Sequence, residues 1–393
     1  MKPNISKIDY CYGCGVCTLA CPLGLITLEK NYDGFFQPVI NNIDKCIGCG
    51  KCLNVCSLYN KKELYESNVN HIFGYASWSK NSVVRQKSSS GGTGFEIASF
   101  LVENGYKFVG VRYNAGKSIA EHYIATKQNE LFASMGSKYI QSFTEDAFHN
   151  LKKGKKYLIT GTPCQIASLR RFLKISRMES DVVLMDFFCH GVPTLNLWLK
   201  YLKEVEKVIG KIKHASWRDK MCGWHDSWVM TLNNFETDLD STEMHKSDEI
   251  TKTGTIFKRK MSDGDIFYKF FLGNMCFNKS CYKDCRFKYL SSCADIRIGD
   301  LWGKKYENNS LGVTGVLALT EIGNDILHRC NVELISEPIE VVTEGQMKKT
   351  LRKPYYYSFL MWLFHTPLKL VTIYRIVQIL RLFSILKHKL NIA

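Results

Sequence analysis

The chain has 393 residues, of which 45% are hydrophobic, so it is long enough for two or three domains with substantial cores. Its formal net charge is +16, but the basic residues are dispersed and form no recognisable nucleic-acid module, so we expect no nucleic-acid partner. Sixteen cysteines and no apolar signal segment near the start favour a cytoplasmic protein whose thiols bind metal rather than form disulfides.

Two closely set cysteine runs lie in residues 1–60. The first has the spacing C-x2-C-x2-C-x3-C-P, and the second repeats the cysteines 35 residues further on. This pattern is typical of a ferredoxin with two [4Fe–4S] clusters, in which each run gives three thiolates to one cluster and its fourth to the other. One cluster would take Cys11, Cys14, Cys17 and Cys56, and the other would take Cys21, Cys46, Cys49 and Cys52.

The alternatives for these runs are structural zinc and disulfides, but zinc sites usually use separated C-x2-C pairs. Ser57 stands where the second run would normally have proline, which removes no ligand. Residues 61–70 are polar and are expected to form a linker.

From residue 71 onward, strand and helix patterns alternate. Strands are expected at 71–78, 107–112, 156–160 and 181–188, and helices at 96–103, 165–173 and 195–208. The alternation favours an α/β or α+β domain over residues 71–350 with a largely buried sheet. A polar loop is expected around residues 233–253.

Residues 351–393 are expected to form a basic, apolar helical tail. In residues 366–393 a polar residue recurs every third position, so apolar side chains would appear on every side of a helix. The regular cations argue against a bilayer-spanning helix. The tail could lie on the inner face of a membrane, dock on another protein or pack on its own domain.

Three further motifs are expected at helix starts or strand ends, where α/β proteins often bind ligands. S-S-S-G-G-T-G at 88–94 leads into a helix, and is either a phosphate cradle or a serine-capped loop. G-T-P-C-Q at 161–165 and C-H-G at 189–191 follow strands, where α/β sheets place ligands, although each cysteine could equally be a buried small hydrophobe. Four more cysteines within 18 residues indicate a third metal site, with zinc as a competitor: Cys276, Cys281, Cys285 and Cys293.

Together these motifs resemble the coenzyme F420 hydrogenase/dehydrogenase beta-subunit family over about residues 70–340. The resemblance rests on S-G-G-T at 90–93, G-S-K-Y at 136–139, G-T-P-C-Q at 161–165, C-H-G at 189–191, W-R-D-K at 217–220 and A-D-I-R-I-G-D-L-W-G at 294–303. It implies an FAD-binding iron–sulfur flavoprotein with the ferredoxin module fused in front. Members exchange hydride with a deazaflavin or act as ferredoxin-driven reductases, and some lie among surface-polysaccharide genes.

The resemblance also implies site residues. Cys276, Cys281 and Cys285 would bind a third [4Fe–4S] cluster, with Cys293, Cys164 or Cys189 as the fourth ligand; the C-x3-C spacing and Lys279 depart from the family pattern. Lys138 and Cys164 are the candidate catalytic residues. The residues expected near the flavin are Ser90, Gly91, Gly92, Thr93, Ser137, Lys138, Tyr139, Thr162, Pro163, Cys164 and Gln165.

The sequence therefore predicts an iron–sulfur flavoprotein oxidoreductase that passes electrons between its [4Fe–4S] clusters and FAD, for two-electron or hydride transfer to a deazaflavin or another small organic substrate. Three oxidised clusters would reduce the net charge to about +10. That basic surface suits an acidic electron-carrier protein or a partner oxidoreductase subunit. The alternative is an electron-transfer adaptor with no substrate chemistry of its own.

Overall fold

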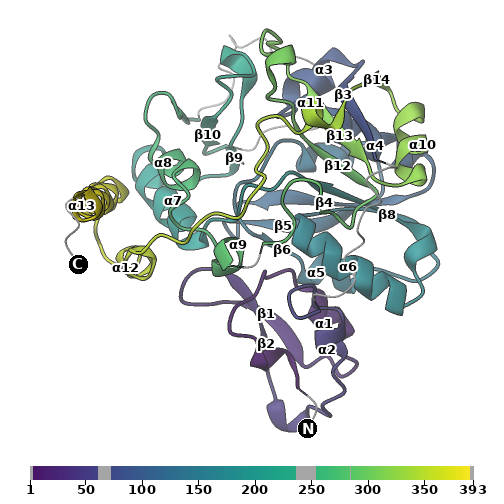
Figure 1. Cartoon of the computed structure of the whole chain (residues 1–393), viewed down its shortest axis with the longest axis horizontal. Helices are drawn as coiled ribbons and strands as arrows, with labels where there is room; N and C mark the ends of the chain where they lie inside the picture. Colours follow the sequence, from purple (N-terminus) through teal and green to yellow (C-terminus); the bar gives the residue numbers. More distant parts are fainter. Residues whose placement is uncertain (1–2, 61–71, 236–253, 284, 390–393) are drawn as a thin grey trace.

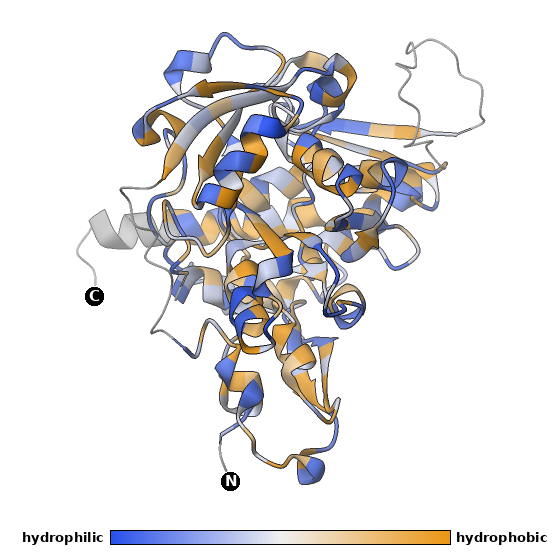
Figure 2. Cartoon of the chain, turned by 90° about the vertical axis from the view of Figure 1, so that its right-hand side faces the viewer, coloured by the Kyte–Doolittle hydropathy of each residue, from blue (hydrophilic) through white to orange (hydrophobic). Residues whose placement is uncertain are grey.

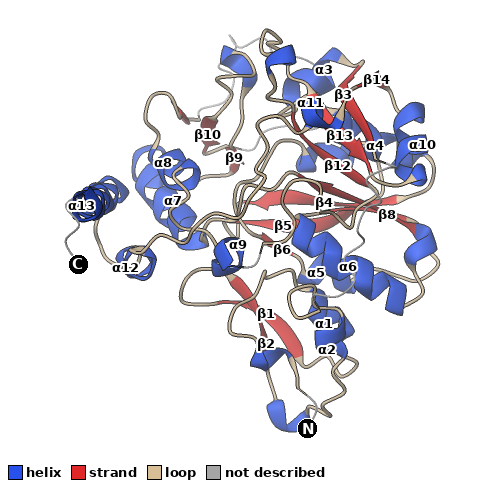
Figure 3. Ribbon diagram, in the orientation of Figure 1, coloured by secondary structure: helices blue, strands red, loops and turns tan. Residues whose placement is uncertain are grey.

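The computed structural model describes residues 3–60, 72–235, 254–283 and 285–389 (Figure 1). The expected linker at 61–70 and most of the expected polar loop at 233–253 lie outside the described residues. What is described forms a small N-terminal module, a domain built on a large mixed sheet, and an aromatic helical layer at one edge of that domain (Figure 3).

The N-terminal module is a β-hairpin with short helices, and it projects from one end of the molecule (Figures 1 and 2). Its elements are η1 (Ile5–Lys7), α1 (Val16–Ala20), β1 (Ile26–Lys30), β2 (Phe36–Ile40), η2 (Ile43–Lys45) and α2 (Lys51–Asn54). Gly15 and Gly50 precede α1 and α2 with φ angles of 77° and 73°, a left-handed conformation that glycine adopts without steric cost. Each cysteine run can therefore turn sharply between its second and third cysteines.

The large sheet has nine strands in the order β14-β3-β13-β12-β8-β7-β4-β5-β6. Its central strands β12, β8, β7 and β4 are parallel, and antiparallel pairs flank them. The strands are β3 (Phe73–Ser79), β4 (Lys107–Asn114), β5 (Ile119–Ala125), β6 (Ser142–Phe143), β7 (Tyr157–Thr160), β8 (Val182–Phe187), β12 (Ile296–Asp300), β13 (Thr314–Ala318) and β14 (Val332–Ser336).

Helices cover both faces of this sheet, which explains why β8 is almost wholly apolar. Val182 and Leu184 pack into a core with α6 and the N-terminal module, whereas Val183 and Met185 pack into a second core with α4 and α10. The helices are α3 (Ser82–Lys87), α4 (Thr93–Glu103), η4 (Asn129–Ser134), α5 (Glu145–His149), α6 (Pro163–Ile175), η5 (Glu179–Asp181), α10 (Glu321–Arg329) and α11 (Ile339–Val342).

The third layer packs aromatic side chains between helices and a small sheet, β11-β10-β9. Trp198 and Trp217 lie at its centre, fully buried, with ring centroids 4.7 Å apart. Its elements are α7 (Leu195–Ile209), β9 (His214–Ser216), η6 (Lys220–Cys222), β10 (Val229–Asn233), β11 (Ile256–Lys260), α8 (Ile266–Leu272), α9 (Lys279–Lys283), α12 (Tyr357–Leu363) and α13 (Leu370–Lys389). The short helix η7 (Lys304–Tyr306) lies instead near the end of β14, where Lys305 pairs with Glu337. No helix in the described part of the chain is both long and apolar enough to cross a bilayer.

The strands and helices expected between residues 72 and 209 are present, with bounds that shift by up to three residues. The mixed α/β architecture is confirmed as well. The antiparallel strands β5, β13 and β14 were not anticipated. Strand pairing is a long-range property, and the local pattern of a short strand does not reveal its neighbour or direction.

A buried ion pair joins two central strands of the sheet. Arg297 on β12 donates to both carboxylate oxygens of Asp186 on β8, at 2.7 and 2.8 Å. Both side chains are almost completely buried. Arg297 also donates to the carbonyl oxygens of Tyr289 and Ser291, and Ser292 Oγ donates to Asp186 at 2.7 Å. The pair thus fixes the segment that leads into β12.

We expect Arg297→Met to lower the free energy of unfolding by about 3–5 kcal/mol, because Asp186 is left as an unpaired buried charge. Denaturant titration followed by circular dichroism measures the loss. The matched control is Lys260→Met, which breaks a 3.0 Å pair with Asp226 in which both side chains are partly exposed. That variant should lose much less stability. Equal losses in the two variants would contradict a special role for the buried pair.

Candidate functional site

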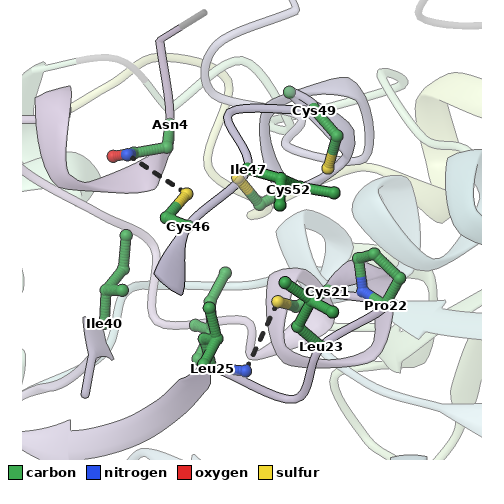
Figure 4. Close-up of a pocket in the computed structure, with 12 residues that line it drawn as sticks. Asn4, Cys21, Pro22, Leu23, Leu25, Ile40, Cys46, Ile47, Cys49 and Cys52 are labelled. Carbon is green, nitrogen blue, oxygen red and sulfur yellow. Dashed lines mark hydrogen bonds between the residues drawn. The ribbon is translucent and has the colours of Figure 1, made fainter. Parts of the chain in front are cut away.

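Four cysteines of the N-terminal module surround one cavity near its tip: Cys21, Cys46, Cys49 and Cys52 (Figure 4). We call them the distal cysteine set. Leu25 N–H donates to Cys21 Sγ at 3.4 Å, and Asn4 Nδ2 donates to Cys46 Sγ at 3.7 Å. Cys21 comes from the first run and the other three from the second, so the fold brings these residues together in the way that the ferredoxin spacing predicts.

The other four cysteines of the module lie nearer the large sheet, and we call Cys11, Cys14, Cys17 and Cys56 the proximal cysteine set. Burial raises the pKa of Cys17, and the charges of Cys14, Cys11 and Cys56, together with that of Cys52 in the distal set, raise it further. Thr144 Oγ1 donates to Cys14 O at 3.1 Å and Ser280 Oγ donates to Cys11 O at 2.7 Å. Both contacts tie the proximal set to the sheet domain.

Ser57 forms part of this junction. Its N–H donates to Ser168 Oγ on α6 at 3.1 Å, and Ser168 Oγ donates in turn to Ser57 Oγ at 2.9 Å. Arg286 donates to Ser57 O. Proline, which normally follows a ferredoxin run, has no N–H to give, so the departure seen in the sequence serves the contact between module and domain.

A third group of thiols comes from three separate segments of the sheet domain. Burial raises the pKa of Cys281 to about 12, and the charges of Cys189 and Cys285 contribute to the rise. Burial also raises the pKa of Cys164. The charges of Cys189 and Cys281, and that of Cys14 in the proximal set, raise the pKa further. We call Cys164, Cys189, Cys281 and Cys285 the inner cysteine set.

Two cysteines expected at a third metal site lie in different surroundings. Cys276 belongs to the aromatic core, and its pKa is raised to about 12 by burial while the Thr194 N–H lowers it. Cys293 lies in the core beneath α6, where its carbonyl accepts from Arg170 Nε at 3.0 Å. Among the described residues, no three His, Cys, Asp or Glu side chains lie close enough together to hold a single metal ion.

A cavity of about 450 Å³ opens at the carboxyl ends of β7, β8 and β12. Cys189 of the inner set lines it, as does Tyr12, which follows the first proximal cysteine. α4 and α6 begin beside it at Thr93 and Pro163. Its size lies within the range of roughly 300–1,000 Å³ that is usual for cofactor sites, and its place at the strand ends is where such sheets bind ligands.

Seven of the residues expected near a flavin line this cavity: Ser90, Gly92, Ser137, Lys138, Tyr139, Thr162 and Gln165. The other four lie behind its wall. Gly91 packs so closely on β3 that a Cβ atom would clash with Ser77 O, and Thr93 Oγ1 donates to Ser77 Oγ at 2.9 Å. Pro163 is buried at the start of α6, and Cys164 belongs to the inner set.

The Lys138 ammonium is turned toward the backbone. Its Nζ donates to the carbonyl oxygens of Ala133, Ser134, Met135 and Gly136 at 2.9 to 3.3 Å. Burial lowers its pKa to about 7. In this structure Lys138 therefore holds the turn that leads to Ser137 and Tyr139, and its contacts are those of a positioning residue.

Two residues of the W-R-D-K motif hold the serine–glycine loop, a role that the sequence did not reveal. Arg218 is buried between the Trp228 and Trp302 rings, donates to Ser89 O at 3.2 Å and pairs with Asp300 at 3.0 Å. Burial opposes its charge, but Asp300 leaves the pKa of Arg218 above its ordinary value. Lys220 Nζ donates to Ser90 O and to Leu311 O.

Lys288 is a further cavity residue that was not anticipated. Its Nζ donates to the carbonyl oxygens of Cys189 and His190 at 2.7 and 3.0 Å. It thus brings a buried cation to the place where Cys189 of the inner set meets the cavity, and a cation there favours nearby negative charge. In the sequence, only its position three residues after Cys285 could have drawn attention to Lys288, and no known motif requires a lysine at that spacing.

Comparison with known proteins agrees with these features. Residues 154–341 match the family described as the C terminus of the coenzyme F420 hydrogenase/dehydrogenase beta subunit, and residues 10–59 match the 4Fe-4S dicluster domain. A similar solved structure is a chain of the F420-reducing [NiFe] hydrogenase complex from Methanosarcina barkeri, at 14% identity and a TM-score of 0.44, covering 72% of this chain and 96% of that one. The curated proteins contain no match.

The chain thus joins an N-terminal 4Fe-4S dicluster domain to a region, residues 154–341, that matches the C terminus of the coenzyme F420 hydrogenase/dehydrogenase beta subunit.

Proposed function

We propose that the chain is an iron–sulfur flavoprotein oxidoreductase that moves electrons between a partner at its N-terminal module and a substrate in the cavity. The observation that supports this most is that Cys189 belongs both to the inner cysteine set and to the cavity wall. A redox group on the inner set would therefore touch whatever the cavity holds.

The inner set fits a third [4Fe–4S] cluster. Four thiols are the donors that such a cluster requires, and they come from α6, from the end of β8 and from the segment at α9. Burial opposes the loss of a proton from these thiols, so cationic iron and nearby donors must compensate for the thiolate charge, and Lys288 lies beside them. This assignment replaces Cys276 and Cys293 with Cys164 and Cys189.

The cavity fits FAD. When bound, FAD would exchange single electrons with a cluster and pairs of electrons or hydride with an organic substrate. The first turns of α4 and α6 would hold its phosphates through backbone N–H groups, next to Ser90, Gly92 and Thr162. Arg218 and Lys220 keep the serine–glycine loop in place, and Lys288 supplies positive charge near the inner set.

The three cysteine sets lie in an order that defines a path. The distal set is near the tip of the module, the proximal set lies between module and domain, and Cys14 is close enough to Cys164 to affect its pKa. Electrons from a carrier protein or a partner oxidoreductase subunit would enter at the distal set and pass inward to the cavity. A deazaflavin or another organic molecule, such as a surface-polysaccharide precursor, would be the two-electron substrate.

Metal content tests the third cluster. The anaerobically prepared chain should contain about twelve iron and twelve sulfide, and Cys189→Ala should contain about eight of each. The matched control is Cys276→Ala, which also removes a buried thiol but should keep about twelve iron. If Cys276→Ala loses iron and Cys189→Ala does not, the ligand set is wrong. Stoichiometric zinc with about eight iron in the parent chain would replace the third cluster with a zinc site.

Flavin content tests the cavity. Gly94 lies in the first turn of α4 and lines the cavity, and a Cβ atom there would meet Ile298 Cδ1 at 2.9 Å. Gly94→Val should therefore lose FAD while both N-terminal clusters remain, as measured by released flavin fluorescence and iron content. Gly92 is a poorer choice because its φ of 91° would strain any other residue.

The control for this test is Gly116→Val, at an open turn between β4 and β5 where the nearest atom is Asn114 Oδ1 at 3.4 Å. It should retain FAD. Retention of FAD by Gly94→Val would place the phosphate cradle elsewhere. Absence of flavin from the parent chain would remove the enzyme proposal and leave the electron-transfer adaptor in its place.

A further inference from the structure

The two C-terminal helices each carry large apolar side chains that are exposed to solvent. On α12, Phe359 and Trp362 stack on each other with ring centroids 5.6 Å apart and are 43% and 52% exposed. On α13, Val371, Ile379 and Leu382 are 46% to 60% exposed. We call these five side chains the tail surface. Large apolar groups gathered in this way usually mark a contact with a partner or a membrane.

The tail surface belongs to a helix that is held firmly in place. Leu370, Ile373 and Val377 are fully buried on the opposite side of α13, toward α8. The Leu370 N–H donates to Glu204 Oε1 on α7 at 2.7 Å, and Lys200 Nζ donates to Thr366 O at 2.6 Å. At 100° per residue, positions 371, 375, 379 and 382 share the outer face. Figure 1 shows α13 as the outermost helix on the side opposite α10.

The charge of this region has one sign. Residues 345–393 contain nine lysines and arginines and no aspartate or glutamate, although the whole chain has 37 acidic residues. Arg375 lies within the exposed stripe of α13, whereas Lys369, just before the helix, and Arg381, within it, are exposed at roughly 80° beyond either edge of that stripe. Arg375 therefore shares a face with the exposed apolar side chains, and the segment contains no acidic side chain to offset its cations.

We propose that the tail surface binds the anionic face of a lipid bilayer, a contact that is independent of the proposed redox function. Tryptophan and phenylalanine beside lysine and arginine are the composition of helices that lie in a membrane interface. A surface that recognises a specific protein partner usually carries both acidic and basic side chains, whereas a surface that binds anionic lipid needs only basic ones. Phe359, Trp362, Ile379 and Leu382 would enter the acyl boundary, and Arg375 would reach the headgroups.

This orientation leaves the electron path open. Figure 1 places α13 and the N-terminal module on different sides of the molecule. A carrier protein could therefore reach the distal cysteine set while α13 lies on the lipid. The cavity would then be held at a fixed distance from the membrane surface.

Vesicle co-sedimentation of the full chain tests the proposal. The chain should sediment with vesicles of phosphatidylcholine and phosphatidylglycerol but not with phosphatidylcholine alone, and salt should release it. Arg375→Gln and Arg381→Gln should each lower the partition constant about fivefold. Trp362→Ser and Ile379→Ser should each lower it about tenfold or more.

Matched controls come from α6, far along the chain from the tail. Ile175 is 61% exposed there and Lys174 beside it is exposed as well. Ile175→Ser and Lys174→Gln should leave binding unchanged. The proposal is overturned if the parent chain fails to bind anionic vesicles, or if the α6 variants lose as much binding as the tail variants. Iron content and circular dichroism of each variant report whether it is folded.

Discussion

The buried pair between Arg297 and Asp186 is the constraint on which the rest of the site depends. A cation and an anion without access to water must satisfy each other fully, and here further guanidinium N–H groups fix the backbone at residues 289 and 291. That segment follows Cys281, Cys285 and Lys288 in the chain. The ion pair therefore fixes the point at which the chain that carries Cys281 and Cys285 joins β12. In this way it also fixes the position of these two cysteines relative to the cavity.

The sequence was sufficient for the N-terminal module because its chemistry is local. The spacing of the cysteines and the glycines between them determine the turns, and even the exchange of Cys21 and Cys56 between sets follows from the pattern. The inner set is different. Cys164 and Cys189 approach Cys281 and Cys285 only because β7 and β8 are neighbours in a sheet that β12 continues. No spacing along the chain encodes that proximity, so from the sequence Cys164 and Cys189 could be named only as alternatives to Cys293 for the fourth ligand.

The cavity shows the same division between local and tertiary information. The glycine loop at 88–94 and the turn at 161–165 were visible as helix starts, and both border the cavity. The basic residues that hold the cavity wall could not be recognised from local sequence in the same way. Lys138 looked suited to a reactive role because of its motif, but its ammonium is used by four carbonyl groups of the preceding turn. Arg218 and Lys220 reach the serine–glycine loop across more than 120 residues, a distance that only the folded chain closes.

Ser57 has a consequence for how the protein is assembled. The turn after Cys56 is completed by α6, through Ser168, and by Arg286. A ferredoxin with proline there could finish its clusters as an independent unit and later be exchanged between partners. In this chain the turn after Cys56, the last cysteine of the proximal set, makes its hydrogen bonds to groups outside the N-terminal module. We therefore expect cluster assembly at the proximal set to depend on folding of the domain that receives its electrons.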